Sequence, residues 1–252
     1  MAAQGTVRFV PSVHFSLTHR RRVRETIRQE KPDIVAVELD EHRFDRIERN
    51  ARVAAGELAQ ELPPATAATY STLKMIQRTA GRLYGLDPGK TDMETAIETA
   101  AELDIDIALI DEPIMETIAP LSTRVGWETL PKMLLRMQTR VLDPHAQARQ
   151  VDLLTLPFRE ITSGDDVQPA IDELRHLLPE IAEVLIDRRD RAMAQRLDRL
   201  RRDGYDVVAV IGAGHHNGIR AVLKQLQTQD TPPDIDVPIR SSTLEVTSIP
   251  IE

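Results

Sequence analysis

The stretch that decides the fold is residues 33–39, DIVAVEL, a run of β-branched and small apolar residues with one carboxylate, Glu38, just before its end. A continuous apolar run of this length is typical of a strand buried on both faces, as in a parallel sheet covered by helices. Comparable runs occupy residues 105–110 and 206–211, and residues 7–13 read as a first strand despite Pro11. The sequence therefore predicts at least four strands of a mainly parallel sheet.

The segments between these runs have helical spacing. Thr18 can cap a helix whose Val23 and Ile27 share a face, and Lys31-Pro32 ends it, which completes a strand-helix-strand unit. Residues 92–103 and 216–227 also read as helices, whereas residues 112–202 show helical periodicity and no strand. We expect a single α/β domain over residues 1–252, a central mainly parallel sheet flanked by helices, with a helical insertion at about 112–202. The C-terminal tail, about 230–252, includes a candidate edge strand at 242–249.

Composition narrows the classes of function. The chain is 41% hydrophobic and 29% charged, which is typical of a globular protein, and it has no cysteine, so any metal must be bound by His and carboxylates. The net charge of −8 disfavours nucleic acid as a partner. We find no signal peptide and no membrane-spanning run, so a cytoplasmic location is the default expectation.

Polar residues cluster where the predicted strands end. Because ligands of open parallel sheets bind outside the carboxyl ends of the strands, these positions are the candidate site. They are His14 and Ser16 after the first strand, Glu38 and Asp40 at the second, Asp111 at the third, and Gly212, Gly214, His215 and Asn217 at the fourth.

Glu38 is the most informative of these residues, because an uncompensated carboxylate in an apolar strand is costly to bury. It either has a catalytic or ligand-binding role or pairs with a helix end or an arginine. The glycine-rich segment 212–218 could hold an anion or a carbonyl oxygen through its backbone N–H groups. A dinucleotide site is disfavoured because the GxGxxG pattern fails at Asn217, so no nucleotide cofactor is expected.

The histidines and one charged segment allow more than one interpretation from the residues alone. His215 and His216 are adjacent and should point in different directions, so we expect His215 to face the site and His216 to begin the helix. His14 is either an ordinary loop imidazole or a site residue. The segment containing Arg188, Arg189 and Asp190 is dense in charge and reads as a solvated helix face.

Five segments together carry a family resemblance. They are PSVHFS at 11–16, PDIVAVELDEHRF at 32–44, PGKTDMETAIETA at 88–100, LIDRRDRAMAQRL at 185–197 and VVAVIGAGHHNGI at 207–219. In this order they resemble the TraB (pheromone-shutdown, PrgY-like) family, which is related to the Tiki and GumN proteins.

The resemblance implies a fold of the erythromycin-esterase/ChaN-like type and a site built from two GxxH-type motifs with a glutamate between them. The glutamate corresponds to Glu38 and the second motif to 212–215, whereas in the first motif Pro11 replaces the glycine before His14. After the third strand this chain has Asp111-Glu112 where relatives tend to have Asp-Arg, so an expected cation is missing. The resemblance also adds Asp92, Arg189 and Asp190 to the candidate site. Archaeal and eukaryotic relatives often carry membrane helices toward the C-terminus, and this chain shows none.

Tiki-type relatives are similar to metal-dependent peptidases, so the resemblance implies a hydrolase that acts on a peptide or similar amide. His14, Glu38 and His215 would bind a divalent metal, Mn, Co or Zn, with Glu38 as ligand or general base. Two alternatives stay open: a non-catalytic protein that binds a peptide or small-molecule ligand, and a metal-free hydrolase in which His14 is the general base.

Overall fold

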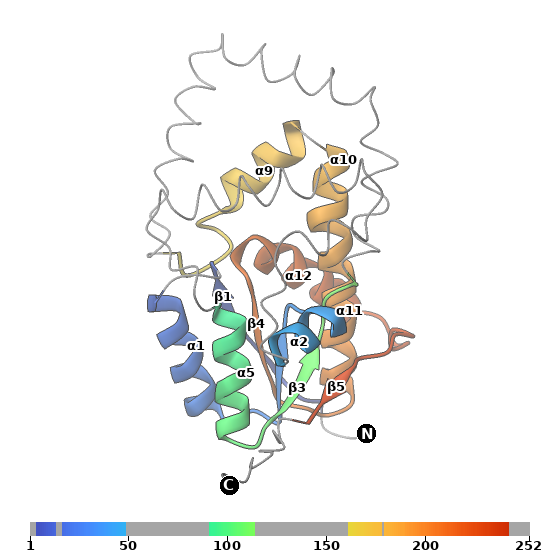
Figure 1. Ribbon diagram of the computed structural model, residues 1–252. Coiled ribbons are helices and arrows are strands. Elements are labelled where there is room, and N and C mark those ends of the chain that lie inside the picture. The colour runs from blue at the N-terminus through green and yellow to red at the C-terminus, as the bar shows by residue number, and fades with distance from the viewer. Residues whose placement is uncertain (1–3, 14–16, 49–90, 114–160, 178, 242–252) are drawn as a thin grey trace, which may run out of the picture.

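The computed structural model describes residues 4–13, 17–48, 91–113, 161–177 and 179–241, which include a five-stranded sheet in the order β1-β4-β2-β3-β5 (Figure 1). The strands are β1 (Val7–Ser12), β2 (Ile34–Val37), β3 (Asp106–Leu109), β4 (Val207–Gly212) and β5 (Ile239–Arg240). The first four are parallel, and β5 runs antiparallel to β3. The predicted α/β class and the four apolar strands are confirmed.

The two central strands are buried along their whole length. Every residue of β2 and β4 is buried, and their register pairs Ala36 with Ala209 and Val37 with Val210. Small and β-branched side chains suit this position because helices cover both faces of the sheet.

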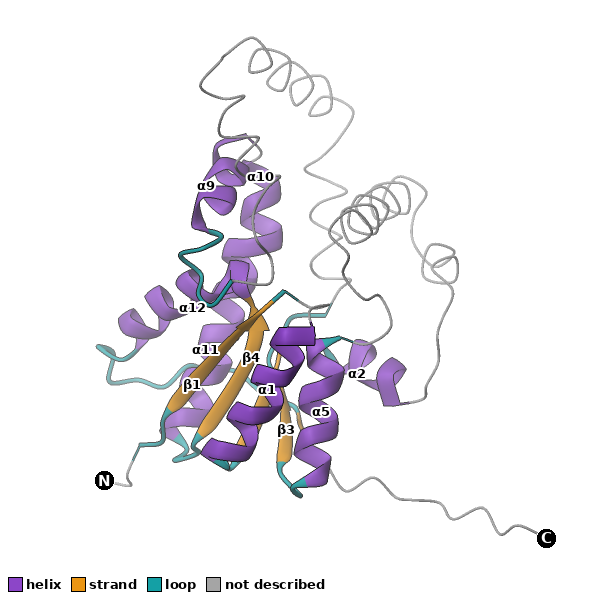
Figure 2. Ribbon diagram, turned by 90° about the vertical axis from the view of Figure 1, so that its left-hand side faces the viewer, coloured by secondary structure: helices purple, strands orange, loops and turns teal. Residues whose placement is uncertain are grey.

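Each face of the sheet packs against its own pair of helices (Figure 2). On one face, α1 (Leu17–Glu30) and α5 (Asp92–Glu102) contribute Val23, Ile27 and Met93 to a core with alternate strand residues. On the other face, α11 (Arg188–Arg202) and α12 (Ala213–Leu226) contribute Leu197 and Ile219. A capping box in which the side chains of Thr91 and Glu94 each accept a backbone N–H fixes the start of α5.

The remaining described helices lie toward the carboxyl ends of the strands. They are α2 (Glu41–Glu48), α9 (Gln168–Leu177), α10 (Pro179–Ala182) and a π-helical turn, η1 (Glu183–Asp187), that continues directly into α11 (Figure 1). The described part of residues 161–202 contains helices and no strand. Residues 114–160 of the predicted helical insertion lie outside the described residues.

Two boundaries differ from the sequence prediction. Helix α12 begins at Ala213 rather than at residue 216, because Gly212 takes the N-cap position with φ −59° and ψ 137°, so His215 lies in the first turn of the helix rather than in a loop. The tail forms the short strand β5 at Ile239–Arg240, and the predicted strand at 242–249 lies outside the described residues. Among the helices that the structure describes, none has the length and apolar character needed to cross a bilayer.

A buried ion-pair cluster joins the C-terminal ends of α11 and α12. Asp198 is fully buried and accepts hydrogen bonds from Arg201 (2.8 Å) and Arg202 (2.7 Å). Arg202 also donates to the backbone carbonyl oxygens of Leu226 (2.8 Å) and Gln229 (2.7 Å). Since the last carbonyls of a helix lack partners within it, this arginine completes the end of α12.

Candidate active site

The carboxyl ends of β2, β3 and β4 bring Glu38, Asp111 and Gly212 together. Glu38 follows β2 directly, Asp111 follows β3 after one residue, and β2 lies between the other two strands. Glu38 and Asp111 are 5% and 3% exposed, so both carboxylates require compensation. The structure shows where that compensation comes from.

Each carboxylate oxygen of Glu38 is held by a donor. Oε2 accepts the backbone N–H of Gly212 at 2.6 Å, and Oε1 accepts Nη2 of Arg189 at 2.5 Å. The ring nitrogen Nε2 of His215 lies 3.4 Å from the same Oε1. Three elements, β4, α11 and the first turn of α12, therefore fix the position of this side chain.

Arg189 joins Glu38 to Asp111 through a bidentate contact. Its Nε and Nη2 donate to the two carboxylate oxygens of Asp111 at 3.0 and 2.7 Å. Arg43 of α2 also donates to Asp111, and its Nε donates to Asp40 at 2.8 Å. The fork of a guanidinium suits such shared carboxylates.

The pKa values reflect these charges. Burial on its own would raise the pKa of Asp111, but the charges and hydrogen bonds of Arg189 and Arg43 outweigh it and hold that pKa well below its usual range. Burial opposes the charge of both arginines as well, yet the carboxylates around them raise their pKa values overall. The arginines and Asp111 are therefore ionised at neutral pH.

His215 is oriented by Asp190. Its Nδ1 lies 2.6 Å from Oδ1 of Asp190, which is only 2% exposed. Oδ2 of Asp190 has no hydrogen-bond partner among the described residues, and it packs against Gly218, where an added Cβ would approach it to 1.7 Å. Burial raises the pKa of Asp190, and the hydrogen bond from His215 opposes that rise.

The π-helical turn η1 ends directly before the residues that α11 contributes. Arg189 follows it by two positions, and Nη1 of Arg189 donates back to the carbonyl oxygen of Leu185 within the turn at 3.2 Å. Single π turns within helices occur frequently at functional sites. Here the turn precedes two consecutive residues with different partners in the site: Arg189 binds Glu38 and Asp111, and Asp190 binds His215.

His216 points away from its neighbour, as the sequence predicted. Its Nδ1 accepts the backbone N–H of Gly164 at 3.0 Å, and its ring packs edge to face against Phe9 with centroids 5.5 Å apart. Burial, followed by the charge of Arg220, lowers the pKa of His216. Its neutral ring therefore anchors the segment before α9 to α12.

The other predicted site residues have varied positions. Asp40 caps α2 and accepts the backbone N–H of Arg43 at 2.8 Å, and Gly214 lies in the first turn of α12 against Ile171. Asn217 donates to Asp165 and Gln168, both at 2.9 Å. Asp92 is buried at the first position of α5. His14 and Ser16 lie outside the described residues.

Arg43 is the site residue that the sequence analysis missed. The pattern Asp40-x-x-Arg43 at the start of α2 was a signal, because these residues lie on one side of the first helical turn. The cation that was expected next to Asp111 in sequence is thus supplied in space by Arg43 and Arg189.

Among the residues that the structure describes, the site has a surplus of negative charge. Its network contains four carboxylates, from Glu38, Asp40, Asp111 and Asp190, and two guanidinium groups, from Arg43 and Arg189. Within the described part of the chain, no three His, Cys, Asp or Glu side chains are grouped closely enough to hold a metal ion. Of the three predicted ligands, Glu38 and His215 are together, and His14 falls outside those residues.

Comparison with known proteins identifies the family. Residues 5–232 match the model of the TraB/PrgY/gumN family, and the chain belongs to this family. It is similar to an uncharacterized protein of Methanocaldococcus jannaschii, with 31% identity over 230 residues. That alignment covers 90% of this chain and 55% of the relative, so the chain spans about half the length of the protein it matches.

Proposed function

We propose that this protein is a metal-assisted hydrolase in which Glu38 and His215 form the central pair. The observation that carries the proposal is the 3.4 Å separation of Nε2 of His215 and Oε1 of Glu38, each fixed by a buried partner. A histidine nitrogen and a carboxylate oxygen that are both held in place and face each other at the carboxyl ends of parallel strands are typical of a ligand or reaction site rather than of a structural ion pair.

Asp190 sets the role of His215. When Nδ1–H donates to the carboxylate of Asp190, the lone pair of Nε2 faces Glu38, so two acceptors point toward the same space. A carboxylate behind a histidine in this way fixes the tautomer and raises the basicity of the outer nitrogen. The arrangement favours a cation, or the hydrogens of a water molecule, between the two side chains.

A divalent ion fits the donor chemistry of this pair and the surplus of negative charge around it. Glu38 and His215 would hold the ion, with His14 as the third ligand that the family motif implies. Such an ion supplies Lewis acidity and lowers the pKa of a water molecule. If Glu38 is the general base rather than a ligand, it would accept the proton of that water, while Arg189 and the N–H of Gly212 keep its carboxylate in place.

The substrate class rests on the family resemblance. Similarity to Tiki-type peptidases favours a peptide or a related amide, and the contacts of the site are compatible with any acyl group that presents a carbonyl carbon to a bound water. The proposal is therefore hydrolysis of an amide bond, with release of a carboxylate and an amine.

A metal-free variant of the same chemistry is favoured by one contact. Arg189 approaches Oε1 of Glu38 to 2.5 Å, and a metal ligand at that oxygen would have to share it with a guanidinium. In that case the Asp190–His215 pair would activate water as an oriented general base, and Glu38 would position the water.

Metal content is the first test. The protein is loaded with Mn, Co or Zn and analysed for bound metal as wild type, Glu38→Gln and His215→Asn, with Glu25→Gln and His42→Asn as controls at exposed positions. Near-stoichiometric metal in the wild type and both controls, lost in the two site variants, is the expected result. A wild-type protein without specific metal would overturn the metal assignment.

Turnover then separates the remaining candidates. A peptide library is incubated with the protein before and after exhaustive chelation, and cleaved products are identified by mass spectrometry. Cleavage abolished by chelation supports the metal-assisted mechanism, and cleavage that survives supports the metal-free one. Binding of a peptide that is lost in Glu38→Gln but never leads to a product would instead show a non-catalytic binding protein.

A further inference from the structure

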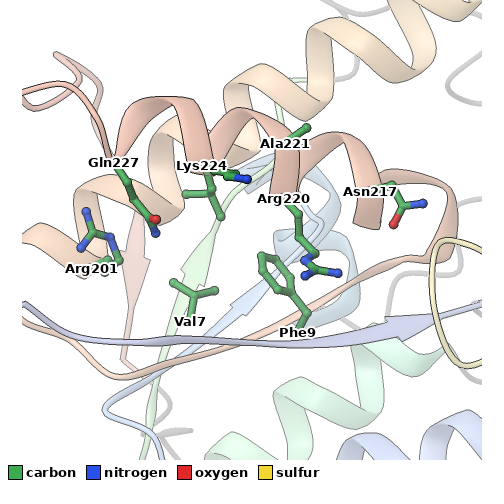
Figure 3. Close-up of a pocket in the computed structure, with 9 residues that line it drawn as sticks. Val7, Phe9, Arg201, Asn217, Arg220, Ala221, Lys224 and Gln227 are labelled. Carbon is green, nitrogen blue, oxygen red and sulfur yellow. The ribbon is translucent and has the colours of Figure 1, made fainter.

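A cavity lies beside the edge strand β1, formed by residues other than the pair Glu38 and His215. It has a volume of about 440 Å³ and lies between β1, which is an edge strand, and α12 (Figure 3). Val7 and Phe9 of β1 and Leu223 of α12 supply its apolar lining. A volume of this order is within the range of small-molecule sites.

The charged residues that line this cavity in the described part of the chain are all cations. They are Arg201, Arg220 and Lys224, and no described Asp or Glu lines it. Arg201 is neutralised by the buried Asp198, with which it pairs at 2.8 Å. Arg220 and Lys224 are exposed, lie one turn apart on α12, and form no ion pair with any residue that the structure describes.

Two unpaired cations beside an apolar surface define the chemistry of the ligand. A phosphomonoester carries about 1.5 to 2 negative charges at neutral pH, which matches the charge of Arg220 and Lys224 together. Arginine binds phosphate oxygens bidentately and lysine binds them as a point charge. The side-chain amide of Gln227, which also lines the cavity, offers a further donor.

We propose that this cavity binds a small organic phosphomonoester, with the phosphate on Arg220 and Lys224 and an apolar or aromatic body against Val7, Phe9 and Leu223. The body distinguishes this ligand from a free phosphate ion, because only the organic part would remove the apolar lining from water. The inference is independent of the hydrolase proposal.

The probe for the test is phenyl phosphate, which joins the two features in one small molecule. Its binding to the full chain is measured by calorimetry at low ionic strength, beside inorganic phosphate and phenol. The variants are Arg220→Gln and the double variant Arg220→Gln/Lys224→Gln, whose exposed positions leave the core intact. Arg21→Gln, at an exposed position of α1 on the opposite face of the sheet, controls for net charge.

We expect saturable binding of phenyl phosphate to the wild type, weakened about fivefold to tenfold by Arg220→Gln and at least about thirtyfold by the double variant. Arg21→Gln should change the dissociation constant less than about twofold, because screening weakens distant charges. Inorganic phosphate and phenol should each bind more weakly than phenyl phosphate.

Four results would overturn the proposal, three from calorimetry and one from NMR. The first is no saturable binding of phenyl phosphate, and the second is an unchanged dissociation constant in the double variant. The third is binding of inorganic phosphate as tight as that of phenyl phosphate, which would reveal an ion site without a place for the organic body. An NMR titration localises the ligand independently, because the ring signals of His216, which packs against Phe9, should shift in the wild type; unchanged His216 signals at saturation would also contradict it.

Discussion

Helix α11 carries two buried aspartates about two turns apart, Asp190 near its start and Asp198 near its end, and their surroundings differ. Asp198 has both oxygens on arginines of its own helix, at 2.8 and 2.7 Å. Asp190 has one oxygen on His215 of another helix, while the other lacks a partner among the described residues.

This difference separates a structural carboxylate from one that serves a site. A buried carboxylate with hydrogen bonds to both of its oxygens holds two helices together, which is the role of Asp198 through Arg202 and the end of α12. A buried carboxylate oxygen without a hydrogen-bond partner lowers the stability of a fold, and such a group is retained when it has a role at a functional site. In the proposed function, the task of Asp190 is to orient His215 toward Glu38.

The largest expected effect is on turnover. Asp190→Asn should lower kcat/KM for the substrate identified by the peptide screen about 10²-fold to 10⁴-fold, because an amide no longer fixes the tautomer of His215. Folding should be preserved, since the change removes a buried negative charge. Steady-state kinetics beside circular dichroism check this, and an Asp190→Asn variant with wild-type kinetics would assign Asp190 a purely structural role.

The matching substitution near the C-terminal end of α11, Asp198→Asn, should lower stability and leave turnover unchanged. Asp198→Asn should lower the free energy of unfolding by about 3 kcal/mol, because Arg201 and Arg202 then lie against a neutral group. Turnover per folded molecule should stay near that of the wild type. Urea unfolding measures the first quantity, and a loss of activity without a loss of stability would contradict the comparison.

A glycine lies against each end of this helix, and the two give a second pair of variants. In Gly218→Ala the added Cβ would meet Oδ2 of Asp190 at 1.7 Å, so Asp190 must move and turnover should fall about 10²-fold. In Gly5→Ala it would meet the carbonyl oxygen of Tyr205 at 1.9 Å, which should cost about 1 to 3 kcal/mol of stability. Steady-state kinetics measures the activity of both variants, and urea unfolding measures their stability. Equal losses of activity in the two variants would contradict a difference in role between the two ends of α11.

The smallest expected effect is on the pH dependence of stability. The pKa of Asp190 is raised by burial above its ordinary value of 3.8, so the folded state keeps this proton to higher pH than the unfolded state does. The stability that this protonation contributes is present below 3.8 and is lost as pH rises through the folded-state pKa. Relative to the wild type, Asp190→Asn should therefore gain stability as the pH rises from about 4, by at most about 1.4 kcal/mol per pH unit.

Asp111 should change the free energy of unfolding with pH in the opposite direction, and it therefore serves as the control for this measurement. Its pKa is lowered because Arg189 and Arg43 outweigh the effect of burial. The stability that ionised Asp111 contributes is present above 3.8 and is lost as pH falls toward its folded-state pKa. The destabilisation caused by Asp111→Asn should shrink as pH falls below about 4. Urea unfolding across this range tests both slopes, and parallel curves for the two variants would contradict the assigned shifts.

The sequence by itself determined the sheet and the edge at which the candidate site lies. Apolar runs of strand length and helical spacing between them are local patterns, so they predicted four parallel strands, and the carboxyl ends of parallel strands must share an edge. Glu38, Asp111 and Gly212 could be placed together for this reason. The start of α12 was predicted three residues late, because a glycine-rich segment reads as a loop until the N-cap geometry of Gly212 is known.

The tertiary structure alone decided how the charges pair. Arg189 and Asp190 read as a solvated helix face and entered the candidate site through the family resemblance, because a helical charge pattern does not reveal which partner lies across the core. Arg43 was missed for the same reason: it meets Asp111 across 68 positions of chain. The partner of a buried charge is set by long-range packing, and only the folded chain brings Asp190 to His215 and Arg189 to Glu38.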